Sequence, residues 1–82
     1  MRVTDEQSEA LAQFVEQLSV NTPGTPHQRA YRSRMAWNAM AMRHCVPNSF
    51  ALDNRISEFR EHAELGGLDK ELIEAVLALI LG

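Results

Sequence analysis

The sequence predicts a small all-α domain, a four-helix bundle, on three observations. Alanine, leucine and methionine, which favour helices, occur 10, 9 and 4 times, whereas valine, isoleucine and threonine occur 5, 3 and 3 times. No stretch alternates apolar and polar residues between turn residues, as a half-buried strand would. Four segments instead combine a helix start signal with apolar residues at helical spacing. The chain has 82 residues, which predicts a single domain over residues 1–82.

The first predicted helix runs from Thr4 to Val20. It opens on a capping box, in which Thr4 is the N-cap and the side chain of Gln7 reaches back to it. Apolar residues recur at i, i+3, i+4 and i+7 and form one stripe: Leu11, Phe14, Val15 and Leu18. The turn that contains Pro23 and Gly24 ends this helix.

The second predicted helix runs from Pro26 to Cys45. Thr25 is its expected N-cap, and Pro47 ends it because the residue before a proline avoids the α conformation. One face of this helix carries Tyr31, Met35, Asn38, Met42 and Cys45. Trp37 and Met40 point elsewhere, so the middle of the helix is apolar nearly all round. That pattern is typical of a central helix with two neighbours.

The third predicted helix runs from Ser49 to Leu65, with a start that stays open between Ser49 and Asp53. Its apolar stripe consists of Leu52, Ile56, Phe59 and Ala63. Gly66 and Gly67 follow, and they supply the left-handed C-cap with which many helices end.

The fourth predicted helix runs from Lys70 to Leu81, with Asp69 as its N-cap. Leu68 and Ile73 are placed to pack against each other as a hydrophobic staple. One broad apolar face is expected from Leu72, Ile73, Val76, Leu79 and Ile80.

This fourth helix also predicts a homodimer. Leu77 and Leu81 lie toward the side away from the broad face, and leaving them in water would expose an apolar patch of the kind that marks a contact. A symmetric contact between two copies would cover it. The residues predicted to form the dimer contact are Ile73, Leu77 and Leu81.

Charge is segregated along the chain. Residues 1–16 carry a net charge of -3, residues 17–52 carry +4 without any acidic residue, and residues 53–82 carry -4. The basic segment has two interpretations that stay open here. Its arginines either neutralise the acidic neighbouring helices within the fold, or form a basic strip that faces an acidic partner or phosphates. Part of this positive charge has a local explanation, because Arg43 and His44 lie where a helix C-terminus favours cations.

The second helix holds the candidate partner-binding residues. Arginine beside exposed apolar side chains is a common composition at the energetic centre of protein interfaces. Trp37 and Met40 are the apolar candidates, although each fits a core position equally well. The arginines of the strip fall within an arc of about 60° on a regular helix. The predicted binding residues are Arg29, Arg32, Trp37, Met40 and Arg43.

The sequence predicts no enzyme, no metal site and no cofactor. Its one cysteine, Cys45, cannot form an intramolecular disulfide and is expected to be a small buried hydrophobe. The three histidines and Cys45 lack the paired spacing of a zinc site. No phosphate-binding loop or nucleophile motif occurs.

A helix-turn-helix in the third and fourth helices is not favoured. Their pattern roughly matches that motif, but the recognition helix would present Asp69, Glu71 and Glu74 to DNA, with Lys70 as its only base. No apolar run approaches the ~20 residues of a membrane span, and no signal-peptide pattern occurs at the N-terminus. With a single cysteine, these features predict a cytoplasmic protein.

The predicted function is that of a small non-catalytic regulator, adaptor or inhibitor, which binds another protein through a helix surface and forms a homodimer. The alternative is a nucleic-acid-binding protein that uses the basic second helix. The net charge of -3 disfavours general attraction to nucleic acid. Small proteins with these traits are frequent in bacteria and their phages, so a bacterial or phage origin is expected.

Overall fold

Four α-helices and one short 3-10 helix make up the fold. The computed structural model describes residues 2–81, and the side chains of residues 2–79. The elements in chain order are α1 (Asp5–Asn21), α2 (Pro26–Ala41), the 3-10 helix η1 (Met42–His44), α3 (Phe50–Leu65) and α4 (Lys70–Leu81). No strand occurs among the described residues. The predicted all-α domain with four helices is confirmed.

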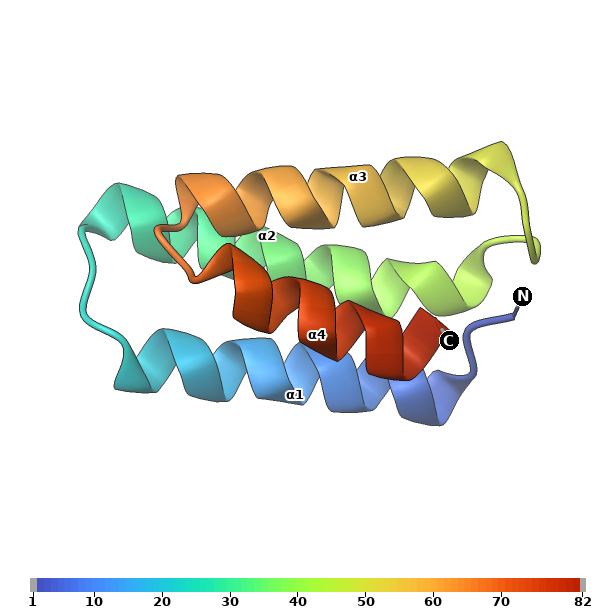
Figure 1. Ribbon diagram of the computed structural model, residues 1–82, viewed down its shortest axis with the longest axis horizontal. Coiled ribbons are helices and arrows are strands. Elements are labelled where there is room, and N and C mark those ends of the chain that lie inside the picture. The colour runs from blue at the N-terminus through green and yellow to red at the C-terminus, as the bar shows by residue number, and fades with distance from the viewer. Residues whose placement is uncertain (1, 82) are drawn as a thin grey trace.

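α2 runs antiparallel to α1 and α3, which point in the same direction, and α4 lies obliquely in front of them (Figure 1). α2 packs against both α1 and α3, as expected of a central helix, whereas α4 contacts α3 and α1. In Figure 1, α4 lies in front of α2, between α1 and α3. Among the described residues, the elements packed against α2 are α1, α3 and η1, so the rest of its circumference has no neighbouring helix.

The predicted capping box at Thr4 is present, and a second one forms at Thr25, the predicted N-cap of the second helix. At the start of α1, the Thr4 hydroxyl accepts a hydrogen bond from the Gln7 backbone N–H at 3.1 Å. The Gln7 side-chain oxygen accepts one in return from the Thr4 N–H at 3.0 Å. Thr25 and Gln28 make the same two bonds at the start of α2, at 3.2 and 2.9 Å. These local bonds satisfy backbone donors that a helix start leaves unpaired.

The second helix ends earlier than predicted. α2 stops at Ala41, and one 3-10 turn follows before Cys45 becomes extended, with ψ at 144°. Helices commonly tighten into 3-10 geometry at their ends. Ser49 then caps α3, because its hydroxyl accepts a hydrogen bond from the Leu52 N–H at 3.2 Å. The start of α3, which the sequence left open, is therefore Phe50.

The turn between α3 and α4 is a Schellman motif. Gly67 is left-handed, with φ at 69°. The Gly67 N–H donates to the Glu64 carbonyl at 3.1 Å, and the Leu68 N–H donates to the Ala63 carbonyl, also at 3.1 Å. Asp69 then caps α4, since its carboxylate accepts from a backbone N–H of the first turn at 2.9 Å. The left-handed cap and the Asp69 N-cap are both confirmed.

The core lies where the inner faces of the four helices meet. Most of its main members come from the predicted apolar stripes, and Leu77, which was predicted to face the other way, joins them: Leu11, Val15, Met35, Met42, Leu52, Phe59, Ala63, Ile73 and Leu77. α1 and α2 meet through small residues, among them Ser8 and Ala39, which are fully buried. The Ser8 hydroxyl donates to the Ala39 backbone carbonyl, so this buried polar group is paired.

Two of the residues predicted to form a dimer contact are buried inside the protomer instead. Ile73 and Leu77 are each 1% exposed and belong to the core. The exposed large apolar side chains of α4 are Leu72 and Leu79, at 40% and 84%. Ile73 belongs to the same core as Leu68, and Leu77 follows one helical turn later on the same face of α4. The third predicted contact residue, Leu81, has a side chain outside the described residues.

Candidate partner-binding surface

Arg32, predicted to belong to an exposed basic strip, is buried. Only 1% of it is exposed, and its guanidinium donates to three backbone carbonyls. Nε donates to Gly66 at 2.9 Å, while Nη1 and Nη2 donate to Thr22 at 2.7 Å and to Pro23 at 3.1 Å. Arg32 thus ties the α1–α2 connection to the α3–α4 connection, and it is not available to a partner.

Helix C-termini explain how this cation is buried without a carboxylate. Because neighbouring helices are antiparallel, the C-termini of α1 and α3 lie beside the N-terminal half of α2 (Figure 1). Thr22 and Gly66 are the C-caps of α1 and α3. Helix dipoles concentrate negative partial charge there, on carbonyls that lack helical donors. The last turn of α1 contains no basic residue, so Arg32 supplies the cation from the next helix.

Four residues spaced three apart, which we call the α2 ridge, wind around the outer side of α2 and into η1: Arg34, Trp37, Met40 and Arg43. Residues at i and i+3 are neighbours on a helix surface. Trp37 is 60% exposed, whereas Met35 and Ala39, on the other side of the helix, are fully buried. Met40 is half-buried and packs against the core. The exposed part of the ridge is therefore centred on Trp37, while Arg34 and Arg43, nine residues apart, point to opposite sides of the helix axis.

A shallow hollow beside Trp37 joins three members of the ridge. Its volume is about 200 Å³, and it is lined by Trp37, Met40, Ala41, Arg43 and His44. The Arg43 Nε donates to the His44 Nε2 at 3.3 Å, which places two basic side chains at one end. The structure thus brings together three of the five predicted binding residues. Arg29 is exposed near the start of α2 and does not line this hollow.

Arg55 of α3 covers the indole of Trp37. Its guanidinium lies 4.6 Å from the ring centroid, which is within the range of a cation–π interaction. The Arg55 Nη1 also donates to the Asn38 Oδ1 at 3.2 Å and lies 3.4 Å from the Glu58 carboxylate. Two partners therefore fix the guanidinium that stacks on Trp37.

Asn38 extends these contacts into the seam between α2 and α3. It is fully buried, and its Nδ2 lies 3.1 Å from the Nδ1 of His62. Because Arg55 can only donate, the Asn38 oxygen faces Arg55 and the Asn38 amide donates to His62. The Tyr31 ring packs on His62 at 5.8 Å. A polar residue within an otherwise apolar buried stripe is a sequence signal for such a network, but the sequence does not indicate Arg55.

The arginines of α2 make no ion pairs within the described part of the chain. The two ion pairs found there join Arg55 to Glu58 within α3, and Arg60 of α3 to Glu74 of α4. Arg34 instead stacks on a neighbouring tyrosine, 5.3 Å from the ring centroid. Direct neutralisation of acidic neighbouring helices by these arginines is therefore not observed. The α2 ridge keeps a positive charge at both ends.

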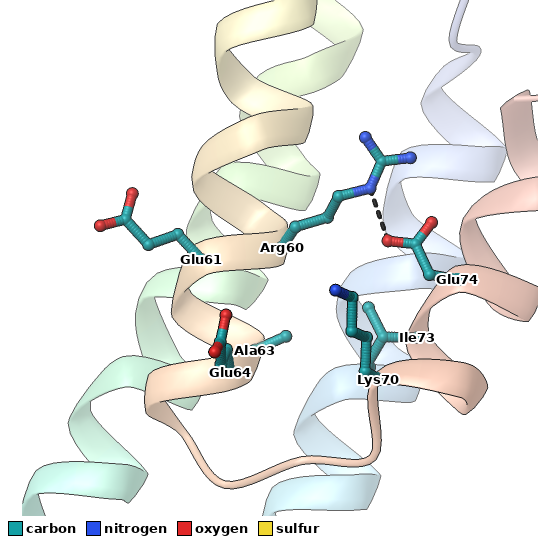
Figure 2. A pocket seen from close by; sticks show the side chains of 7 residues that line it. All are labelled: Arg60, Glu61, Ala63, Glu64, Lys70, Ile73 and Glu74. Atoms are coloured by element: carbon teal, nitrogen blue, oxygen red, sulfur yellow. Dashed lines mark hydrogen bonds and ion pairs between the residues drawn. The ribbon is translucent and has the colours of Figure 1, made fainter.

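A second cleft, between α3 and α4, is bridged by an ion pair (Figure 2). Its volume is about 260 Å³, and Ala63 and Ile73 of the core belong to its lining. Arg60 and Glu74 reach toward each other across it, with 2.6 Å between Nε and Oε1. Both signs of charge line it, since Lys70 lies beside Glu74 in the same cleft. These are the features of a seam between two packed helices.

The described residues hold few other groups that could bind a metal or react. No three His, Cys, Asp or Glu side chains among them gather as they would around a metal ion. Cys45, expected to be buried, is half-buried against the core, and its thiol donates to the Ala41 carbonyl at 3.6 Å. No described helix has both the length and the apolar character of a membrane span.

Comparisons with protein-family models, with curated proteins and with solved structures give no match. The function is therefore argued from the α2 ridge and its surroundings.

Proposed function

We propose that the protein is a non-catalytic protein-binding domain, acting as a regulator, adaptor or inhibitor, whose partner covers the α2 ridge. The observation that carries this proposal is Trp37, an indole that is 60% exposed and yet fixed by Arg55. Burial of apolar surface contributes about 25 cal/mol per Å², so a partner that covers this ring gains free energy. Tryptophan and arginine are also the residue types that most often dominate interface energetics.

Preorganisation supports the same proposal. A side chain that is already held in one conformation loses less entropy when a partner binds. Arg55 is held by Asn38 and Glu58, and its guanidinium in turn stacks on Trp37. The ring and the guanidinium form one rigid surface. We further propose that the protein works in the cytoplasm, because a single free cysteine suits a reducing compartment.

The test compares two exposed aromatic residues. Trp37→Ala removes the centre of the α2 ridge, and Phe50→Ala is the matched control, because Phe50 is 85% exposed but lies outside the ridge. Each protein is used to capture partners from the native host, and the captured partner is then purified and titrated. We expect wild type and Phe50→Ala to bind it equally, and Trp37→Ala to bind at least about 30-fold more weakly, as for a hot spot of 2 kcal/mol. Equal binding by all three refutes the proposal.

Nucleic-acid binding is the second candidate, favoured by the positive charge on α2, which no ion pair compensates in the described part of the chain. An exposed tryptophan between arginines is also a component of single-strand binding surfaces, where bases stack on aromatic rings. Fluorescence polarisation with duplex and single-stranded DNA separates the two candidates. Binding that falls steeply with salt and is lost in Trp37→Ala would favour nucleic acid.

A homodimer remains a prediction, with its contact moved to other residues. Because Ile73 and Leu77 are buried, a dimer through α4 would have to use its exposed apolar face, where Leu72 and Leu79 lie. The light-scattering test of this contact is given in the Discussion.

A further inference from the structure

We infer that the protonation state of His62 controls the surface around Trp37. Neutral His62 keeps Arg55 stacked on the indole, and a proton on His62 releases it. The consequence for partner binding rests on the proposed function, because it concerns regulation of the same site. The change itself runs from His62 through Asn38 and Arg55 to Trp37 and can be measured without a partner.

The contact between Asn38 and His62 defines the form of the imidazole. The Arg55 Nη1 donates to the Asn38 Oδ1 at 3.2 Å, which turns the Asn38 Nδ2 toward His62, 3.1 Å from its Nδ1. An amide nitrogen only donates, so the His62 Nδ1 accepts this bond and carries no hydrogen. His62 is therefore the neutral tautomer with its hydrogen on Nε2.

A proton on the His62 Nδ1 breaks this contact, because two donors would then face each other. Rotating the Asn38 amide by half a turn restores a bond from His62 to Oδ1, but it turns Nδ2 toward Arg55, which also only donates. Asn38 is 1% exposed, so water cannot readily take the place of the missing partner. Asn38 can serve neutral His62 and Arg55 together, but not protonated His62 and Arg55.

The second partner of Arg55 responds in the same direction. The Glu58 carboxylate lies 3.4 Å from the Arg55 Nη1, and Glu58 precedes His62 by four residues on α3. Residues at i and i+4 are neighbours on a helix, and opposite charges there attract. Protonated His62 therefore competes with Arg55 for Glu58 as well as for Asn38. The proton weakens both bonds of the guanidinium that lies 4.6 Å from the Trp37 ring centroid.

The titratable and charged groups near His62 belong to α2 and α3. On α2, the Tyr31 ring packs on His62 at 5.8 Å, and Arg34 stacks on that same ring. On α3, the groups are Arg55 and Glu58. In the described part of the chain, none of them forms an ion pair with His62. No ion pair therefore holds the imidazole in its charged form.

The other elements bring no charge to His62. The charged residues of α4 that meet α3, Lys70 and Glu74, line a cleft to which His62 does not belong. The basic residues of η1 lie at the opposite end of α3, since His62 is in the last turn of that helix (Figure 1). α1 does not pack against α3. His62 is half-buried, so solvent protons reach it, and histidine is the side chain that changes charge between pH 5 and 8.

The experiment follows the fluorescence of Trp37, the one tryptophan of the chain, between pH 8 and about pH 5. Emission maximum and quenching by acrylamide are measured in wild type, His62→Asn and His44→Asn. Asparagine places an oxygen near the position of Nδ1, so it keeps an acceptor for Asn38 but cannot gain a proton. His44→Asn is the matched control, because His44 is exposed and lines the hollow beside Trp37, where its own charge can affect the indole.

We expect acidification to move the emission of wild type and His44→Asn to longer wavelength and to increase quenching. The ratio of stacked to released Arg55 should fall about fivefold, as for the loss of one hydrogen bond of about 1 kcal/mol. His62→Asn should keep its pH 8 emission down to pH 5. A wild-type emission that does not change with pH overturns the inference. So does a change that persists in His62→Asn or disappears in His44→Asn.

A measurement on wild type alone covers the case in which His62→Asn does not fold. In nuclear magnetic resonance, the side-chain amide of Asn38 and the guanidinium of Arg55 should shift with the same midpoint as the His62 ring. Different midpoints, or an Asn38 amide that does not respond, overturn the inference. Either failure leaves the proposed function standing, because that is tested by partner binding of Trp37→Ala at a single pH. Failure of the partner test, in turn, leaves the pH response of Trp37 as measured.

Discussion

Arg32 and Arg34 are two residues apart on α2, yet one is structural and the other is available to a partner. The Arg32 guanidinium is buried and donates to three carbonyls near the C-termini of α1 and α3. Arg34 is exposed on the outward face and stacks on the ring of Tyr31. A basic residue on a helix therefore does not by itself indicate a binding site. An arginine has a structural role where its side chain reaches the carbonyl groups at the C-termini of neighbouring helices, as that of Arg32 does.

α4 repeats this contrast with apolar residues. Leu77 is 1% exposed in the core, whereas Leu79, two residues later, is 84% exposed. A two-residue step on a helix turns the side chain by about 200°, so such pairs face nearly opposite directions. In both helices, two residues of the same type lie two positions apart, and one is buried while the other is exposed to solvent.

The largest expected effect comes from placing a carboxylate on each side of α4. Leu77→Glu puts an unpaired charge into the core, and we expect it to cost about 4 kcal/mol or more, enough to unfold a small domain. Leu79→Glu changes an exposed side chain and should alter the free energy of unfolding by no more than about 0.5 kcal/mol. Circular dichroism at 222 nm during urea titration measures both. A folded Leu77→Glu would contradict the assignment of the inner face.

The same pair tests the homodimer. If α4 forms a symmetric contact through its exposed face, Leu79→Glu should remain folded and turn a dimer into a monomer in light scattering. Wild-type protein that is already monomeric at high micromolar concentration would show that the dimer prediction is wrong.

Arg32 and Arg34 should differ by about 3 kcal/mol when each is changed to methionine. Arg32→Met leaves three buried or half-buried carbonyls without their donor, and hydrogen bonds from charged groups contribute about 1.5–3 kcal/mol each before relaxation and hydration reduce the loss. Arg34→Met removes only a stacked surface cation, worth about 0.5 kcal/mol. Urea unfolding gives both values. Equal stability of the two variants would remove the structural role assigned to Arg32.

Glycines in the two connections that Arg32 ties together give the next effect. Gly67→Val forces a β-branched residue into a left-handed conformation, and its Cβ would lie 2.6 Å from the Gln28 side chain. We expect a loss of about 2 kcal/mol. Gly24→Ala needs no unusual φ, but its Cβ would lie 2.7 Å from the Arg32 Nη2, so we expect a loss of about 1 kcal/mol. Thermal unfolding should therefore rank Gly67→Val below Gly24→Ala, and equal melting temperatures would contradict the left-handed cap.

Local signals account for what the sequence predicts well. The helix starts at Thr4, Thr25 and Asp69 and the stop at Gly67 each depend on residues within a few positions, so they can be read from the chain alone. Helical spacing likewise separates Trp37 from the buried stripe of its own helix, although the sequence left open whether it lies in the core or at an interface; the structure shows it 60% exposed. These predictions need no knowledge of how the helices pack.

What the sequence could not supply depends on distant neighbours. The acceptors of Arg32 include Gly66, 34 positions away, so nothing near Arg32 in the chain distinguishes it from an exposed arginine. Arg55 reaches Trp37 from another helix for the same reason. The inner face of α4 was also misassigned, because an almost wholly apolar helix offers no polar side to mark solvent.

The smallest expected effect concerns the link between the interior and the α2 ridge. Asn38→Leu keeps the number and branching of the side-chain heavy atoms but removes the acceptor for Arg55 and the donor for His62. We expect a loss of about 1 kcal/mol, because both abandoned groups are half-exposed and can bind water. Tryptophan fluorescence gives a more specific measurement, since Trp37 is the one tryptophan of the chain. Release of Arg55 would expose the covered face of the indole and move its emission to longer wavelength.

Ser33→Ala is the matched control for this measurement, because Ser33 is an exposed residue of α2 whose hydroxyl donates only to the Arg29 carbonyl of its own helix. Its emission should equal that of wild type. If Asn38→Leu also leaves the emission unchanged while the protein stays folded, then Asn38 does not hold Arg55 over the ring. The rigidity of the ridge would then rest on Glu58 alone, the other partner of Arg55. The position of Arg55 over Trp37 would then not depend on the buried seam between α2 and α3. It would be held only weakly, because an exposed ion pair of this kind contributes less than about 1 kcal/mol.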